Sequence, residues 1–198
     1  GGLDLKFPHH EAEIAQQEAA SGKKPFVKVW MHTGLMRIHG KKMSKSLGNF
    51  ITVRDFLKTH EPETLRWIIL FNHYRSPSNY AESVATQARE SMESVEELLQ
   101  KLVLRKKSKK TIAGEEKPDI KKEIQKAKQK FQNAMQDDFN TPEALAAIFE
   151  LTREINVGVW NLTQKEAREA ENFLTKILTS LGLTSKPQPT PKNIGNMA

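Results

Sequence analysis

The sequence predicts a mainly α fold, in which a residual α/β piece is followed by a helical connector and an antiparallel helical bundle. Two observations predict this fold. From residue 79 onward, apolar residues recur at steps of three and four, which is the period of amphipathic helices that pack together. Before residue 51, two short apolar runs lead into a turn at His39-Gly40-Lys41, as strands do.

The first helix is expected at residues 9–21, because Pro8 suits a first helical turn and Gly22 suits a helix end. Strand-like runs follow at residues 26–31 and 35–38. The connector should hold helices at residues 53–57 and 62–72, the second with Pro62 at its first helical position.

The four bundle helices are expected to begin near residues 79, 120, 141 and 163. Their predicted start and stop signals are Asn79 with Glu82, Thr141 before Pro142, Thr163 with Glu166, and Gly182 at the end of the last helix. The proline-rich segment 184–198 cannot continue a helix and should end the folded unit.

Composition narrows the class of protein. The chain has 198 residues, 37% of them apolar, which is enough for one or two domains with a real core. It contains no apolar run long enough to span a membrane, no leader pattern and no cysteine. We therefore expect a cytoplasmic monomer with no membrane partner and no disulfide.

Positive charge is concentrated in one part of the chain. The net charge is +7, and residues 101–130 hold twelve Lys or Arg against four Asp or Glu. An RNA backbone attracts such a surplus, but the run also lies between two helical patterns. A tRNA contact and a solvated linker therefore both remain open for these residues.

The most informative segment is Lys42-Met43-Ser44-Lys45-Ser46, which follows the turn. Two ammonium groups and two hydroxyls on a short polar loop can hold a polyphosphate and stabilise charge that develops during phosphate chemistry. Taken alone, a Lys-x-x-Lys pattern is more often a solvated turn. The surrounding motifs favour the phosphate interpretation.

This pentapeptide matches the second signature of class I aminoacyl-tRNA synthetases. The stretch Phe7-Pro8-His9-His10-Glu11-Ala12-Glu13-Ile14-Ala15-Gln16 resembles that of cysteinyl-tRNA synthetases, with Ala12 where the family pattern usually has Asn. Further similar motifs follow in order at residues 30–34, 73–76 and 137–144. The resemblance covers residues 1 to about 183.

The resemblance implies a reaction and a set of site residues. ATP with Mg²⁺ would activate cysteine to cysteinyl-adenylate, and the acyl group would then pass to tRNA(Cys). Lys42 and Lys45 are the catalytic candidates, and they would contact the ATP phosphates together with Ser44 and Ser46.

His9 and Glu13 are the candidate metal ligands. They lie one helical turn apart, so their side chains share one face, although such a pair is more often a surface contact than a metal site. In the family they resemble half of a Zn²⁺ site completed by two cysteines. Because this chain has no cysteine, we expect Zn²⁺ only in the complete enzyme.

The first signature of class I enzymes, His-x-Gly-His, is absent from this sequence. We therefore interpret the chain as the C-terminal portion of a synthetase, with the missing N-terminal half of the catalytic domain supplied in cis, and expect no aminoacylation from the chain alone. The expected divisions are 1–50 for the end of the Rossmann-type catalytic domain, 51–76 for the connector, 77–183 for the tRNA-binding bundle and 184–198 for the tail.

Two other functions remain open on the sequence alone. Mycothiol-pathway cysteine ligases share the metal pair and the lysine-rich loop but join cysteine to an amino sugar. A non-catalytic tRNA-binding module is also compatible with the missing first signature.

Overall fold

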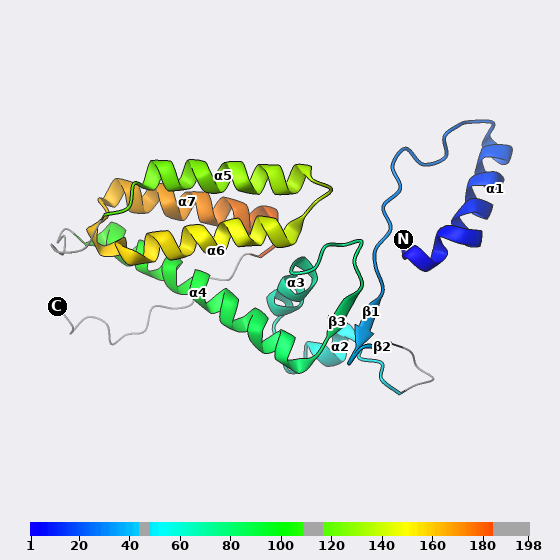
Figure 1. Cartoon of the computed structure of the whole chain (residues 1–198), viewed down its shortest axis with the longest axis horizontal. Helices are drawn as coiled ribbons and strands as arrows, with labels where there is room; N and C mark the ends of the chain where they lie inside the picture. Colours follow the sequence, from blue (N-terminus) through cyan, green and yellow to red (C-terminus); the bar gives the residue numbers. More distant parts are fainter. Residues whose placement is uncertain (44–47, 109–116, 184–198) are drawn as a thin grey trace.

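The computed structural model describes residues 1–43, 48–108 and 117–183. The predicted mainly α fold is confirmed: helices α1 to α7 dominate the described residues, and the one small sheet among them has three strands. In Figure 1, α1 projects away from the sheet, and the bundle helices lie beyond the sheet on the opposite side.

The N-terminal helix ends where it was expected, and its regular α part starts two residues later. Short helical stretches at Leu3–Leu5 and Lys6–His10 lead directly into α1, Glu11–Ser21. Gly22 ends α1 in the left-handed conformation, at φ 65°, and its N–H donates to the carbonyl of Glu18. An extended segment then runs from α1 to the sheet (Figure 1).

The predicted strand at residues 26–31 is wrong, because these residues pair with no other strand in the described part of the chain. The second prediction is largely right, since β1 spans Met36–Ile38. It lies at the centre of the sheet, antiparallel to β2 at Lys41–Lys42 and parallel to β3 at Ser78–Tyr80.

Two connector helices follow the lysine-rich hairpin. Helix α2, Val53–Phe56, is capped by the Thr52 side chain, which accepts a hydrogen bond from the Asp55 N–H. Helix α3, Pro62–Leu70, has Pro62 at its first position as predicted and ends two residues earlier than expected.

The bundle consists of α4 (Glu82–Lys107), α5 (Ile120–Gln136), α6 (Thr141–Val157) and α7 (Gln164–Ser180), with a single turn at Val159–Asn161 between the last two. Figure 1 shows α5, α6 and α7 side by side, with the longer α4 crossing them and reaching toward the sheet.

The structure corrects two of the predicted helix caps. Helix α4 starts after Ala81 without a side-chain cap, because Asn79 lies in β3 and instead accepts a hydrogen bond from the Gly40 N–H at 2.7 Å. Helix α6 is capped by Asn140, which places Thr141 inside the helix. The predicted Thr163–Glu166 capping box at α7 is confirmed.

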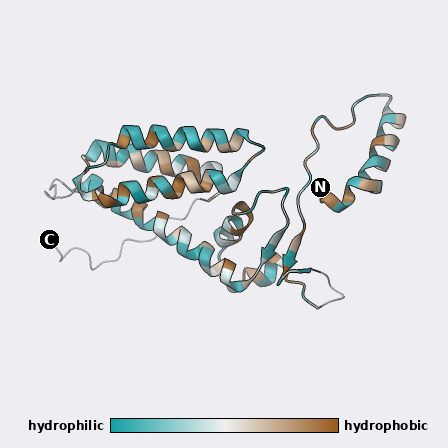
Figure 2. Cartoon of the chain, in the orientation of Figure 1, coloured by the Kyte–Doolittle hydropathy of each residue, from teal (hydrophilic) through white to brown (hydrophobic). Residues whose placement is uncertain are grey.

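One apolar core joins the connector to the bundle. Trp67 and Ile68 of α3 are buried in the same cluster as Leu98 of α4 and Leu174 of α7. Apolar residues form stripes along the bundle helices in Figure 2, as burial of one face of each helix requires. No helix among the described residues combines the length and apolar composition needed to cross a bilayer.

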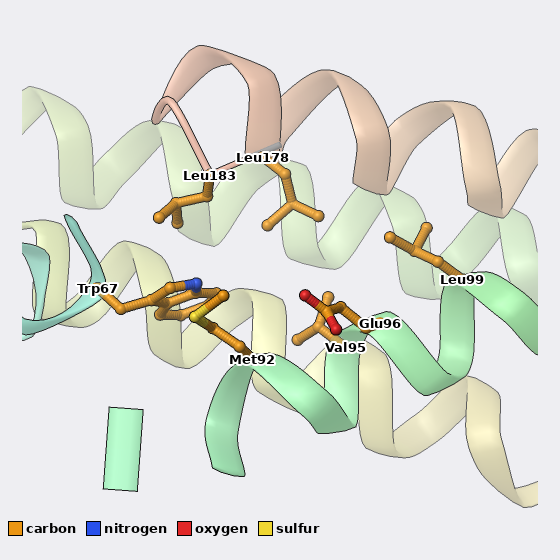
Figure 3. A pocket seen from close by; sticks show the side chains of 7 residues that line it. All are labelled: Trp67, Met92, Val95, Glu96, Leu99, Leu178 and Leu183. Atoms are coloured by element: carbon orange, nitrogen blue, oxygen red, sulfur yellow. The ribbon is translucent and has the colours of Figure 1, made fainter. Parts of the chain in front are cut away.

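A small apolar cavity remains where α3, α4 and α7 meet. Trp67, Met92, Leu178 and Leu183 line it, and the Glu96 carboxylate lies among these side chains (Figure 3). Burial raises the pKa of Glu96, while Arg89 opposes this shift. This cavity belongs to the packing of α3 against the bundle and lies apart from the lysine-rich hairpin.

Candidate functional site

The described part of the lysine-rich segment begins on a tight hairpin. His39 and Gly40 have φ values of 50° and 75°, and Lys42 pairs with Arg37 across the β1–β2 ladder. Lys42 is exposed, and its carbonyl accepts a hydrogen bond from the Asn49 side-chain amide at 3.1 Å. Ser44, Lys45 and Ser46 lie outside the described residues.

A hollow lined mainly by apolar side chains lies beside this hairpin. Its lining includes Met36 of β1, Met43, Phe56 of α2, Ile69 of α3 and Tyr80 of β3. Burial, and then a hydrogen bond to Glu82, raise the pKa of the Tyr80 hydroxyl to about 12. The sheet therefore packs toward α2 and α3, which places the Lys42 hairpin at the edge of the folded body.

His9 and Glu13 face each other as their spacing predicted. The His9 Nε2 atom lies 3.4 Å from the Glu13 Oε1 atom, and their side chains are 60% and 46% exposed. In the described parts of the chain, His, Asp and Glu do not gather into any group of three or more that could hold a metal ion. These residues therefore supply at most two ligands on an accessible helix face.

An imidazole and indole cluster lies next to this pair, and its geometry was not predicted. The buried His10 has its Nδ1 atom 2.9 Å from the His32 Nε2 atom, and the Trp30 ring stacks on the His32 ring at 5.7 Å between centroids. Desolvation and the neighbouring His10 lower the pKa of His32. The motif at residues 30–34 marked these residues, but the sequence did not show which partner they would meet.

The structure brings three sequence motifs together. The Gly34 N–H donates to the Tyr74 carbonyl at 2.7 Å, and a Cβ at Gly34 would lie 2.1 Å from the Ser76 carbonyl oxygen. Only glycine allows the two backbones to approach so closely. The Tyr74 hydroxyl in turn donates to Asp138 Oδ1 at 2.7 Å, and Arg75 forms an ion pair with the same carboxylate.

Asp138 lies in the turn between α5 and α6, so this contact joins the bundle to the loop before β3 (Figure 1). Arg75 and the Tyr74 hydroxyl lower the pKa of Asp138, because both stabilise its charged form. We call residues 32–35, 73–77 and 137–140 the joint.

Part of the basic surplus is neutralised within the bundle. Lys126 and Lys130 of α5 approach Glu150 of α6 at 2.8 and 2.5 Å, and their hydrogen bonds lower the pKa of Glu150 to about 2. Lys122 and Lys128 remain exposed on α5. The tRNA contact considered for residues 101–130 therefore stays a prediction for the exposed lysines.

Comparisons with known proteins place this geometry in a family. A model described as the tRNA synthetases class I (C) catalytic domain matches residues 1–90, and a DALR domain model matches residues 130–185. The cysteine–tRNA ligase of Chromohalobacter salexigens is 48% identical over 156 residues, which cover 79% of this chain and 31% of the relative. The cysteine–tRNA ligase of Azotobacter vinelandii is 46% identical over 192 residues, which cover 97% of this chain and 38% of the relative.

A solved structure shares the fold. The crystal structure of a ternary LeuRS–tRNA–LeuAMS complex from Agrobacterium radiobacter K84 matches 96% of this chain and 28% of its own chain, with a TM-score of 0.73 and 21% identity. The chain spans less than half the length of the curated relatives it matches. With both family models and these identities in agreement, the chain belongs to the cysteinyl-tRNA synthetase family of class I aminoacyl-tRNA synthetases.

Proposed function

We propose that the complete protein containing this chain is a cysteine–tRNA ligase. It joins cysteine to ATP to give cysteinyl-adenylate and pyrophosphate, and then transfers the cysteinyl group to tRNA(Cys). The observation that carries the proposal is the His9–Glu13 pair, because it presents an imidazole and a carboxylate 3.4 Å apart within the piece of fold that also bears the Lys42 hairpin.

The lysine-rich loop acts on ATP in this proposal. Lys42 and Lys45 contact the phosphates, and Ser44 and Ser46 donate hydrogen bonds to them, with Mg²⁺ bound to the nucleotide. The exposed position of Lys42 at the edge of the folded body leaves its ammonium group accessible to a polyphosphate. Charge that develops on the leaving pyrophosphate is stabilised by such groups, so their effect falls mainly on the rate.

The metal pair selects the amino acid. His9 and Glu13 are ligand types that Zn²⁺ takes, and their distance and exposure fit two positions on one ion, with the other ligands supplied elsewhere in the complete protein. Bound Zn²⁺ would supply a bond to the cysteine thiolate, which the hydroxyl of serine forms poorly. The chain's own contribution is to orient the imidazole and the carboxylate on one face of the helix.

The rest of the chain binds tRNA in this proposal. Residues 51–76 form the connector between the catalytic piece and the RNA, and the bundle at 77–183 forms the tRNA-binding domain, with residues 1–50 ending the catalytic domain. The DALR match within the bundle supports this division. The protein acts in the cytoplasm as a monomer.

Adenylate formation tests the role of the loop. In the complete enzyme, Lys45→Ala should lower kcat for ATP–pyrophosphate exchange far more than it changes the KM for cysteine. Lys41→Ala is the matched control, because Lys41 is exposed on the same hairpin and makes no ion pair among the described residues. A change confined to KM in the Lys45 variant would remove Lys45 from the catalytic role.

Metal content tests the pair. Glu13→Gln should lower the zinc stoichiometry of the complete enzyme measured by atomic absorption, because the amide is a weaker ligand than the carboxylate. Glu11→Gln should not, since Glu11 is exposed and His9 forms its ion pair with Glu13. Full zinc content in the Glu13 variant would exclude Glu13 as a ligand.

A further inference from the structure

We infer that Asp138 is a positioning residue. It lies in a turn of the bundle and acts through Tyr74 and Arg75. Through them it keeps His32, on the segment that also carries Gly34, next to His10. This inference concerns the packing of the chain and does not depend on the proposed reaction. It connects a turn of the bundle with the surroundings of the proposed metal pair.

Asp138 contacts the loop before β3 directly. Asp138 Oδ1 accepts hydrogen bonds from the Tyr74 hydroxyl at 2.7 Å and from Arg75 Nη2 at 3.1 Å. Arg75 Nε also pairs with Oδ2 and donates to the Tyr74 hydroxyl at 2.9 Å. The carboxylate therefore fixes two neighbouring side chains of one loop at the same time.

Backbone hydrogen bonds connect that loop to the segment next to the histidines. The Tyr74 carbonyl accepts the Gly34 N–H at 2.7 Å, and the Leu35 carbonyl accepts the Ser78 N–H at 3.2 Å. Two residues before Gly34, His32 meets His10 at 2.9 Å. A displacement of the Tyr74 loop would therefore act on the backbone that holds His32 against His10.

The backbone of the bundle turn supports the same inference. Asp138 and Phe139 have φ values of 52° and 56°, and Phe139 is 50% exposed. A left-handed conformation is tolerated by Asp but is unfavourable for Phe. The turn therefore takes a costly conformation, which closes the end of α5 through hydrogen bonds from the Phe139 and Asn140 N–H groups to the carbonyls of Met135 and Ala134. The same conformation places the Asp138 carboxylate against Tyr74 and Arg75.

The apolar core does not anchor the segment that contains Gly34 and Leu35. Trp67 and Ile68 anchor α3 to the bundle, whereas Gly34 and Leu35 belong to no buried cluster among the described residues. Their segment is held through backbone hydrogen bonds to the loop and to β3, and the preceding Thr33 bonds to the backbone of Gly1 and Leu3. Local opening of this segment should therefore respond to Asp138 while the bundle stays closed.

Amide hydrogen exchange of the 198-residue chain, followed by NMR, tests the inference. Asp138→Asn keeps the shape of the side chain and its tolerance of the left-handed conformation but removes the charge. Because the Arg75 and Asp138 side chains are 60% and 41% exposed, we expect a modest effect. Exchange at the Gly34 and Ser78 amides should accelerate about two- to fivefold, as for an exposed ion pair.

Two controls separate positioning from general destabilisation. The Leu181 and Leu183 amides, which donate to the carbonyls of Ile177 and Leu178 within the bundle, should keep their exchange rates. Asp137→Asn should change nothing, because the neighbouring Asp137 side chain makes no hydrogen bond or ion pair with the described residues. Tyr74→Phe, which removes only the phenol donor, should accelerate the same two amides as Asp138→Asn.

The inference is overturned if Gly34 and Ser78 exchange at the original rate in the Asp138 variant, or if all amides accelerate equally. It is also overturned if Asp137→Asn has the same effect as Asp138→Asn.

Discussion

A single methyl group at residue 34 should separate the two backbones that meet at the joint. In Gly34→Ala, the new Cβ would lie 2.1 Å from the Ser76 carbonyl oxygen, 2.3 Å from its carbon and 2.7 Å from the Pro77 nitrogen. All three are backbone atoms, so no side chain can rotate away to make room. The segments must move apart, and the hydrogen bonds from Gly34 to Tyr74 and from Ser78 to Leu35 should be lost.

The size of the effect follows from these two bonds. Each hydrogen bond stabilises a fold by about 1 kcal/mol net, so their loss should favour local opening by about 2 kcal/mol. This free energy corresponds to an opening equilibrium that rises about 30-fold. Exchange of the Ser78 amide with solvent deuterium should accelerate by the same factor, while amides within α7 should not.

A second glycine provides the control. Gly22 has a positive φ of 65°, but a Cβ there would meet no atom within 4 Å. Gly22→Ala should therefore cost about 1 kcal/mol at the end of α1, through its backbone conformation alone, and leave the Ser78 amide unchanged. Unchanged Ser78 exchange in Gly34→Ala would show instead that the close approach of the two backbones contributes nothing to their pairing.

Three further predictions concern the stability of the bundle, measured as the free energy of unfolding in urea. The paired lysines lower the pKa of Glu150 from 4.5 to about 2, so its charge stabilises the fold above pH 4.5 and this contribution is lost as the pH falls toward 2. Glu150→Gln should therefore cost about 1 kcal/mol of stability at pH 7 and almost nothing near pH 2; the value at pH 7 takes account of the solvent exposure of the ion pair. An equal cost at the two pH values would contradict this prediction. Thr163→Ala removes one side of the capping box with Glu166 and should lower the free energy of unfolding by about 1 kcal/mol. Glu166→Ala can cost less than Thr163→Ala, but the absence of any loss in both variants would contradict the capping role. Leu98 is 0% exposed, so Leu98→Ala should cost about 2 to 5 kcal/mol of stability. Leu99→Ala, at the partly buried neighbouring position, should cost clearly less. Equal costs would show that burial does not decide the loss of stability.

Helices were predictable from the sequence where local chemistry decides them. The period of apolar residues located the bundle helices, and the Thr163–Glu166 box and Pro62 marked two helix starts correctly. Such signals act within one or two turns, so they need no knowledge of the tertiary fold.

Strands and caps were less predictable, because distant partners decide them. Asn79 has a side chain suited to a helix cap, yet it lies in β3, which pairs with β1. Its side-chain oxygen accepts a hydrogen bond from the Gly40 N–H. The apolar run at residues 26–31 has strand composition but finds no neighbouring strand among the described residues. A strand depends on its pairing, which local sequence does not reveal.

The site was predictable in part. The spacing of His9 and Glu13 indicated their shared face correctly, because one helical turn determines it. The contact of Tyr74 with Asp138 joins residues that are 64 positions apart, and only the folded chain brings them together. The motifs marked both residues as noteworthy without showing that they touch. The roles of Lys42, Lys45, Ser44, Ser46, His9 and Glu13 in the reaction stay predictions.

The decisive measurement is cysteine-dependent exchange of pyrophosphate into ATP by the complete protein. For a cysteine–tRNA ligase we expect exchange with cysteine that needs no amino sugar and is far weaker with serine, followed by tRNA-dependent formation of cysteinyl-tRNA. Exchange that leads to no tRNA product but to cysteine joined to an amino sugar would contradict it. Binding of tRNA without any cysteine-dependent exchange would contradict it as well, and would leave an RNA-binding module in place of a ligase.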